Sequence, residues 1–179
     1  GQGRPGMFGG EPDEPHETPG EEFAKGHYEQ LIEATGTMRV GDREWQINGF
    51  GLRDHSWGPR YWQAPWYYRW LTANFGPESG FVLSVVTARD GNERVGGAVL
   101  RDGAYEHIHK AKIDTTWAGD DQYHAALSAT ATTANGTYEI TGKPSNDECS
   151  NATEGVTGWQ ALTTATVTAR TTSTPVPTV

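Results

Sequence analysis

The stretch YYRWLTANFGPESGFVLSVVTARDGNERVGGAVLRDG, residues 67–103, decides the fold class of this chain. Its aromatic and β-branched runs are divided by three turn-forming segments, GPESG, DGNE and RDG. Runs of this kind favour extended strands, and the Gly, Pro, Asn and Asp residues between them favour tight turns. The stretch therefore predicts antiparallel strands that follow one another as a meander.

The same pattern continues on both sides of this stretch. Upstream, TMRVGDREWQING (residues 37–49) alternates apolar and polar residues around Gly41-Asp42, which is typical of a β-hairpin. Downstream, residues 104–117, 123–133 and 137–142 predict further strands, separated by the turn-forming segments AGDDQ and ANG. No segment has the apolar period of a long helix. The sequence thus predicts an all-β, antiparallel fold.

Composition divides the chain into three parts. Residues 1–25 are rich in Gly, Pro and Glu and nearly lack aliphatic residues, so we expect an extended or mobile acidic arm. Residues 26–142 form the predicted β domain. Residues 143–179 are Thr-rich and weakly specified, with at most one late strand and a loose tail.

Charge and cysteine content exclude several classes of protein. The formal net charge of −9 disfavours nucleic acid as a partner, because a phosphate backbone repels a negative surface. Cys149 is the only cysteine, which excludes an internal disulfide and a thiolate metal cluster. We find neither an apolar run as long as a membrane span nor a signal-peptide core, and we expect a cytoplasmic protein. GFGLRD (residues 49–54) lacks the third glycine of a dinucleotide motif, and no cofactor is predicted.

The densest chemistry lies in GFGLRDHSWGPRYWQAPWYYRW, residues 49–70. In an extended segment, Arg53, His55 and Trp57 face one way and Asp54 faces the other. His55 has an ordinary pKa near neutrality and could give or take a proton beside an aromatic wall. A packing role is equally open, because an arginine stacked on an indole and a satisfied Arg–Asp pair serve structure alone.

Two further groups of side chains are candidates for a ligand site. Tyr67 and Trp70 lie on opposite faces of one predicted strand, so one of them lines an interior and the other a second layer or interface. Tyr105, His107 and His109 share one face of another predicted strand. A metal needs at least three converging ligands, and local geometry supplies two imidazoles. We therefore interpret this group as a polar strand face or a cavity lining, and no metal is predicted.

Three segments carry a resemblance to a known family: GHYEQ (26–30), GTMRVGDREWQINGFGLRDHSWGPR (36–60) and YYRWLTANF (67–75). Together they resemble the lipocalin-like family of carotenoid 1,2-hydratase (hydroxyneurosporene synthase) and kievitone hydratase, most specifically at the glycine-flanked RDHSWG. The resemblance extends to about residue 142. It implies a calycin or lipocalin-like antiparallel β-barrel, or a strongly curved sheet, that is a single domain or half of a tandem-barrel arrangement.

The resemblance also implies a chemistry. The hydratase members add water to a carbon–carbon double bond by acid catalysis and without a cofactor. His55 and Trp57 match the histidine and tryptophan of the family motif. The hydratases use, in addition, a carboxylic acid on a following strand, and FVLSVVTAR (residues 81–89) contains none.

Two hypotheses of function follow. The first is a cofactor-independent hydratase-, dehydratase- or cyclase-like lyase that acts on an apolar, isoprenoid- or polyketide-like substrate by general acid–base chemistry. The second is a non-catalytic carrier of a hydrophobic small molecule, and a homodimer that supplies a second barrel is a further option. The catalytic candidates are His55 and Asp54, and the substrate-binding candidates are Trp57, Arg53, Tyr67, Trp70, Tyr105, His107 and His109.

Overall fold

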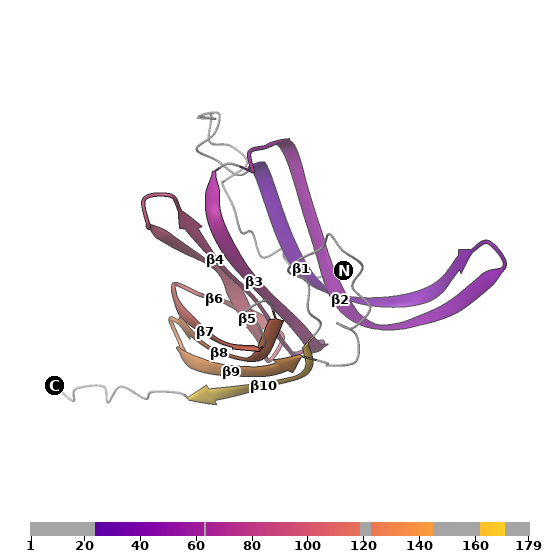
Figure 1. Cartoon of the computed structure of the whole chain (residues 1–179). Coiled ribbons are helices and arrows are strands. Elements are labelled where there is room, and N and C mark those ends of the chain that lie inside the picture. Colours follow the sequence, from indigo (N-terminus) through magenta and orange to yellow (C-terminus); the bar gives the residue numbers. More distant parts are fainter. Residues whose placement is uncertain (1–23, 63, 119–122, 145–161, 171–179) are drawn as a thin grey trace. The chain divides into compact units, whose positions relative to one another are not determined.

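The computed structural model of the chain describes residues 24–62, 64–118, 123–144 and 162–170. These residues form ten β-strands and no helix, and every strand pairing among them is antiparallel (Figure 1). The predicted all-β, antiparallel fold is therefore confirmed. By its internal contacts the chain divides into two compact units, Gly1–His109 and Lys110–Val179.

The first unit contains a two-stranded ribbon and a four-stranded sheet. The ribbon pairs two long strands, β1 (Ala24–Val40) and β2 (Arg43–Arg60). The sheet has the order β3-β4-β5-β6, so strands that are neighbours in sequence are neighbours in space. Its strands are β3 (Pro65–Gly76), β4 (Ser79–Ala88), β5 (Glu93–Arg101) and β6 (Ala104–His107).

The predicted turns account for two of these hairpins. Gly41 has a φ of 59° and precedes Asp42 in the two-residue loop between β1 and β2. Asp102 and Gly103 have φ values of 49° and 74° in the two-residue loop between β5 and β6. Positive φ at both central residues, as at Asp102-Gly103, is the pattern of a type I′ turn. A glycine with positive φ at the first central residue alone, as at Gly41-Asp42, is the pattern of a type II′ turn, and the twist of both types matches that of the flanking strands. Local turn chemistry therefore sets the register of both hairpins.

One part of the core of the first unit lies where the base of the ribbon meets the sheet, and Phe81, Leu83 and Val99 are buried on the other face of the sheet. Leu31 of β1, Val82 of β4 and Leu100 of β5 form one buried cluster. Gly80 lets Leu31 approach, because a Cβ atom at this position would lie 2.6 Å from Leu31 Cδ1. Three partly buried side chains surround the cluster: Leu52, Trp70 and Tyr105.

A polar clamp holds the ribbon to the sheet beside this core. The side-chain amide of Asn74, on β3, donates to the carbonyl oxygens of Ile32 at 3.0 Å and Gly51 at 2.9 Å. Ile32 and Gly51 pair with each other across the ribbon. One side chain of the sheet thus binds both strands of the ribbon at the same level.

The second unit is a four-stranded sheet with the order β10-β9-β8-β7. Its core comes from alternate residues that are buried on β8 and β9, including Leu127, Ala129, Tyr138 and Ile140. The four strands are β7 (Lys110–Ala118), β8 (Tyr123–Thr133), β9 (Gly136–Pro144) and β10 (Leu162–Arg170). None of the described segments of the chain is a helix of the length and apolarity that a membrane crossing requires.

Three expectations need correction or lie outside the described residues. The described strands do not close into a barrel, because β3 and β6 are the two edges of an open sheet and β1 and β2 pair with each other alone. The predicted strand 104–117 is broken at Ile108 and His109, where the Ile108 amide donates to the Gly97 carbonyl at 2.9 Å. Most of the predicted arm, residues 1–23, lies outside the described residues, as do residues 145–161 and 171–179 of the C-terminal segment.

Candidate functional site

Pairing within the ribbon sorts its side chains onto two faces. Tyr28 pairs with His55, and the next residues along, Glu29 and Asp54, pair with each other. Directly paired side chains lie on the same side of an antiparallel pair, and successive residues alternate. The face that carries Leu31 packs on the β3–β6 sheet and is called the inner face here; the face that carries His55 is the outer face.

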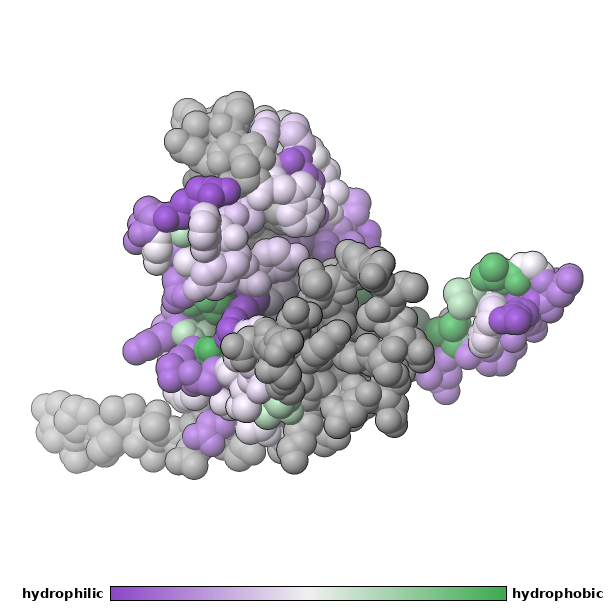
Figure 2. Space-filling view, viewed as in Figure 1, coloured by the Kyte–Doolittle hydropathy of each residue, from purple (hydrophilic) through white to green (hydrophobic). Residues whose placement is uncertain are grey.

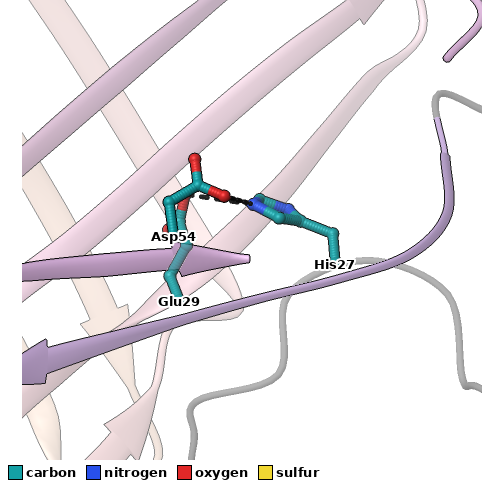
Figure 3. Close-up of side chains that lie close together, drawn as sticks. All are labelled: His27, Glu29 and Asp54. Carbon is teal, nitrogen blue, oxygen red and sulfur yellow. Dashed lines mark hydrogen bonds and ion pairs between the residues drawn. The ribbon is translucent and has the colours of Figure 1, made fainter. Parts of the chain in front are cut away.

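The inner face brings together a histidine and two carboxyl groups, which we call the inner cluster: His27, Glu29 and Asp54 (Figure 3). His27 Nε2 lies 2.9 Å from Asp54 Oδ1 and 3.6 Å from Glu29 Oε1. The three ligand-type atoms all lie within 4.8 Å of one another. Groups this close can share a proton, and they are also of the types that bind divalent cations.

Strand geometry explains why these residues meet. His27 and Glu29 are two positions apart on β1 and therefore project from one face. Asp54 lies directly across from Glu29 and diagonally across from His27, whose own partner is Ser56. A register irregularity between Ala24 and Gly26 marks the start of the regular pairing, one residue before the cluster.

Burial is graded across the inner cluster. The exposed fraction rises from 4% for the Glu29 side chain to 20% for His27 and 45% for Asp54. The cluster therefore opens to solvent on the side of Asp54 and is closed around Glu29. A small polar molecule can reach Asp54 and His27 from solvent, whereas Glu29 lies against protein.

The environment of Glu29 favours its protonated form. Burial is the largest influence and raises the pKa of this carboxyl above its ordinary value, because a carboxylate loses hydration in the interior. A side-chain hydrogen bond from Trp70 and the positive charge of His27 oppose this rise, and the negative charge of Asp54 adds to it. Burial prevails, so Glu29 keeps its proton to a higher pH than an exposed glutamate.

Trp70 links the inner cluster to the hydrophobic core. Its indole lies beside the Glu29 carboxyl and acts to lower the pKa of that group, and its ring packs against the cluster of Leu31, Val82 and Leu100. Tyr105, another predicted substrate-binding residue, packs against the same core. The structure thus places two of the predicted site residues beside Glu29: Asp54 from β2 and Trp70 from β3.

The outer face holds the residues of the family motif. The ring centroids of Tyr28 and His55 are 5.3 Å apart, and those of His55 and Trp57 are 5.7 Å apart. Arg53 Cζ lies 5.0 Å from the centroid of the Tyr28 ring, which is a cation–π distance. His55 is exposed, and Trp57 covers the backbone of Gly26, where an added Cβ would overlap its ring. These contacts make an exposed aromatic stack.

The other predicted site residues lie apart from both groups. Tyr67 is half exposed on β3, three positions from Trp70 and therefore on the opposite face of the sheet. His107 ends β6 and shares a face with Tyr105, whereas His109 lies beyond the strand. The predicted substrate-binding residues therefore do not converge on one place.

Sequence reasoning missed His27 and Glu29, the most buried members of the site. Their signal was present in GHYEQ (residues 26–30), where a histidine and a glutamate two positions apart share the face of Leu31 in a strand. An acidic side chain beside a core leucine is a polar residue at a buried position. Such a residue points to a satisfied charge or a functional group.

The described fold and site define a small all-β domain with a partly buried carboxyl–imidazole cluster on a β-ribbon. The chain belongs to the family described as Domain of unknown function (DUF7064), whose model matches residues 5–173. No curated protein matches the chain, and no solved structure matches it. The family description names no activity, so the case for a function rests on the geometry of the site.

Proposed function

We propose that this protein is a cofactor-independent acid–base lyase, of the hydratase, dehydratase or cyclase kind, and that the inner cluster is its catalytic centre. The substrate is an apolar, isoprenoid- or polyketide-like molecule. The observation that carries the proposal is Glu29, a 96% buried carboxyl group that touches both His27 and Trp70 and pairs with Asp54. Glu29 takes the role of the carboxylic acid that the following strand, β4, lacks.

A general acid must hold its proton at working pH and release it in a dry environment. The raised pKa of Glu29 supports this role, and so does the apolar surround of Leu31 and Trp70. In hydration, the proton of Glu29 passes through the imidazole of His27, 3.6 Å away and open to solvent, to one carbon of a double bond, which leaves a carboxylate and a carbocation. The ring face of Trp70 stabilises the cation through cation–π attraction.

His27 and Asp54 complete the proton balance. Water bonds to the carbocation and loses one proton, which His27 accepts while Asp54 stabilises the imidazolium that forms. Transfer of that proton to the Glu29 carboxylate, 3.6 Å away, restores the starting state. The net reaction adds one water to one double bond, and the reverse sequence is a dehydration.

The decisive experiment separates Glu29 from the residues of the outer face. The purified protein is incubated with linear isoprenoid alkenes in water labelled with oxygen-18, and mass spectrometry measures label in the alcohol product. The variant Glu29→Gln should lose at least about a hundredfold in turnover, the usual scale for a general acid. Glu33→Gln is a matched control, because Glu33 lies four residues further along the same strand and is exposed.

His55→Ala tests the alternative assignment that the family motif suggests. Loss of turnover in this variant with full turnover in Glu29→Gln would move the acid–base role to the outer face and contradict the role of Glu29. The carrier hypothesis gains support from the exposed aromatic rings of Trp57 and Tyr67. If every alkene is bound but recovered unlabelled from the wild-type protein, the lyase proposal is wrong and the carrier is favoured.

A further inference from the structure

The outer part of the β1–β2 ribbon, residues 32–51, extends beyond the core and is called the ribbon arm here. Figure 1 shows the arm leaving the β3–β6 sheet as an isolated pair of strands. Two-stranded ribbons are marginally stable on their own in water, so a long one gains from a cover. Figure 2 shows hydrophobic residues open to solvent along this arm.

One face of the ribbon arm is apolar. Met38 pairs with Trp45, and Gly36 pairs with Ile47 two positions further in, so these side chains share one face. The exposed fractions are 47% for Met38 and 41% for Trp45, which are high for large apolar side chains in regular strands. The exposed large hydrophobic residues of this face are Met38, Val40, Trp45 and Ile47.

Apart from Phe50, which is 46% exposed and lies near Gly76 at the base of the arm, the opposite face of the arm is polar, and its side chains bond to one another. Thr37 donates to Gln46 across the ribbon at 3.2 Å, and Arg39 donates to Glu44 from Nε at 3.1 Å. A face of this kind needs no partner. The arm is therefore amphipathic: the polar side chains of one face bond to one another, and the apolar side chains of the other face are exposed to solvent.

Gly49 leaves a position without a side chain on the apolar face of the ribbon arm. It pairs with Ala34, and a Cβ atom added to it would meet no atom within 4 Å among the described residues. Its φ is outside the positive range, so no turn requires a glycine there. A glycine inside a strand weakens the strand and often marks the close approach of another backbone or ligand. Gly49 and Ala34 thus form a shallow gap on the arm beside the bulky pair of Met38 and Trp45.

We propose that the ribbon arm is a self-association surface and that its occupant is the arm of a second copy of this chain. A two-fold axis at the Gly36/Ile47 level, perpendicular to the strands and parallel to the ribbon plane, places two apolar faces together. Trp45 of each copy then lies over Gly49 of the other, and Met38 lies over Ala34. Each contact between a bulky side chain and a gap occurs twice, once from each copy, as an isologous interface requires.

Charge and area support a second copy over other occupants. Residues 32–51 contain two arginines and three acidic residues, a net charge of −1, which disfavours an anionic membrane or a nucleic acid. The exposed large hydrophobic residues amount to roughly 400 Å² per copy, so two copies bury roughly 800 Å², which is below the size of a stable specific interface and in the range of weak, transient ones. The dimer is therefore weak, with a dissociation constant on the order of 10–100 µM.

Sedimentation equilibrium of the full chain between about 1 and 300 µM tests this proposal, because that range brackets the expected dissociation constant. The average mass should rise from 19.5 kDa towards twice that value. Gly49→Val fills the gap without a clash in the monomer and should weaken the dimer at least tenfold, and Trp45→Ala should do the same. The matched control is Thr37→Val on the polar face, which should leave association unchanged.

Thermal melting of each variant shows that it is folded, and Gly49→Val is expected to melt at or above the wild-type temperature because valine favours strands. A wild-type mass that stays at 19.5 kDa over the whole range would overturn the proposal. So would a dimer that Gly49→Val and Trp45→Ala leave intact, because its interface would lie elsewhere. Neither result bears on the acid–base role of Glu29.

Discussion

Asn74 should hold the base of the ribbon on the sheet, and the loss of stability on its removal can be worked out from its two hydrogen bonds. The side chain donates two hydrogen bonds, to Ile32 O at 3.0 Å and Gly51 O at 2.9 Å. A hydrogen bond of this kind contributes about 1 kcal/mol net, so Asn74→Ala should lower the free energy of unfolding by about 2 kcal/mol. Asn74→Asp should cost at least as much, because a carboxylate cannot donate to either carbonyl.

Urea unfolding followed by tryptophan fluorescence measures this change as a shift of the midpoint at constant slope. Hydrogen exchange should show faster exchange in β1 and β2 beside Ile32 and Gly51, because the ribbon loses its attachment there. Asn92→Ala is the control, since Asn92 bonds to Asp90 in an exposed turn, and its cost should be below about 0.5 kcal/mol. Equal costs for the two alanine variants would refute the reasoning.

Three more predictions concern the same ribbon. Gly80→Ala should destabilise by about 1–3 kcal/mol in urea unfolding, because its new methyl group would overlap Leu31; an unchanged midpoint would argue against this packing. Gly26→Ala should displace the indole of Trp57 and change its fluorescence while leaving turnover intact, and loss of turnover would assign catalysis to the outer face. Glu29 faces His27 and Asp54, and its pKa is raised in the folded state. The stability that Glu29 contributes is therefore complete below its pKa in the unfolded chain and is lost as pH rises through its pKa in the folded protein. Wild-type stability relative to Glu29→Gln should therefore fall as pH rises above the ordinary glutamate value of 4.5, and a difference that stays constant or grows would contradict the raised pKa.

Much of the strand pattern was predictable because it depends on local chemistry. Gly41 and the pair Asp102-Gly103 specify tight hairpin turns wherever they occur between strands. Barrel closure was not predictable in this way, since it depends on which edges pair across the fold. The break at Ile108 and His109 has the same origin, because it follows a backbone bond to distant Gly97.

The candidate site was half predictable for a related reason. Alternation correctly separated Asp54 from His55 and Trp57, but it cannot say which face of a ribbon meets the core. The motif RDHSWG drew attention to the outer face, where His55 lies in an exposed aromatic stack. Leu31 packs on Val82, so the inner face of the ribbon lies against the sheet. Glu29 is buried because it lies on the same face as Leu31.

The pKa of Glu29 itself tests the central claim most directly. Carbon-13 NMR of glutamate-labelled protein follows the side-chain carboxyl of each glutamate through a pH titration, and Glu29→Gln identifies the resonance. The account predicts a midpoint for Glu29 above 4.5, the ordinary value for a glutamate. A Glu29 midpoint at or below 4.5 would show a carboxylate that is ionised at neutral pH, and this residue could not then be the proton donor.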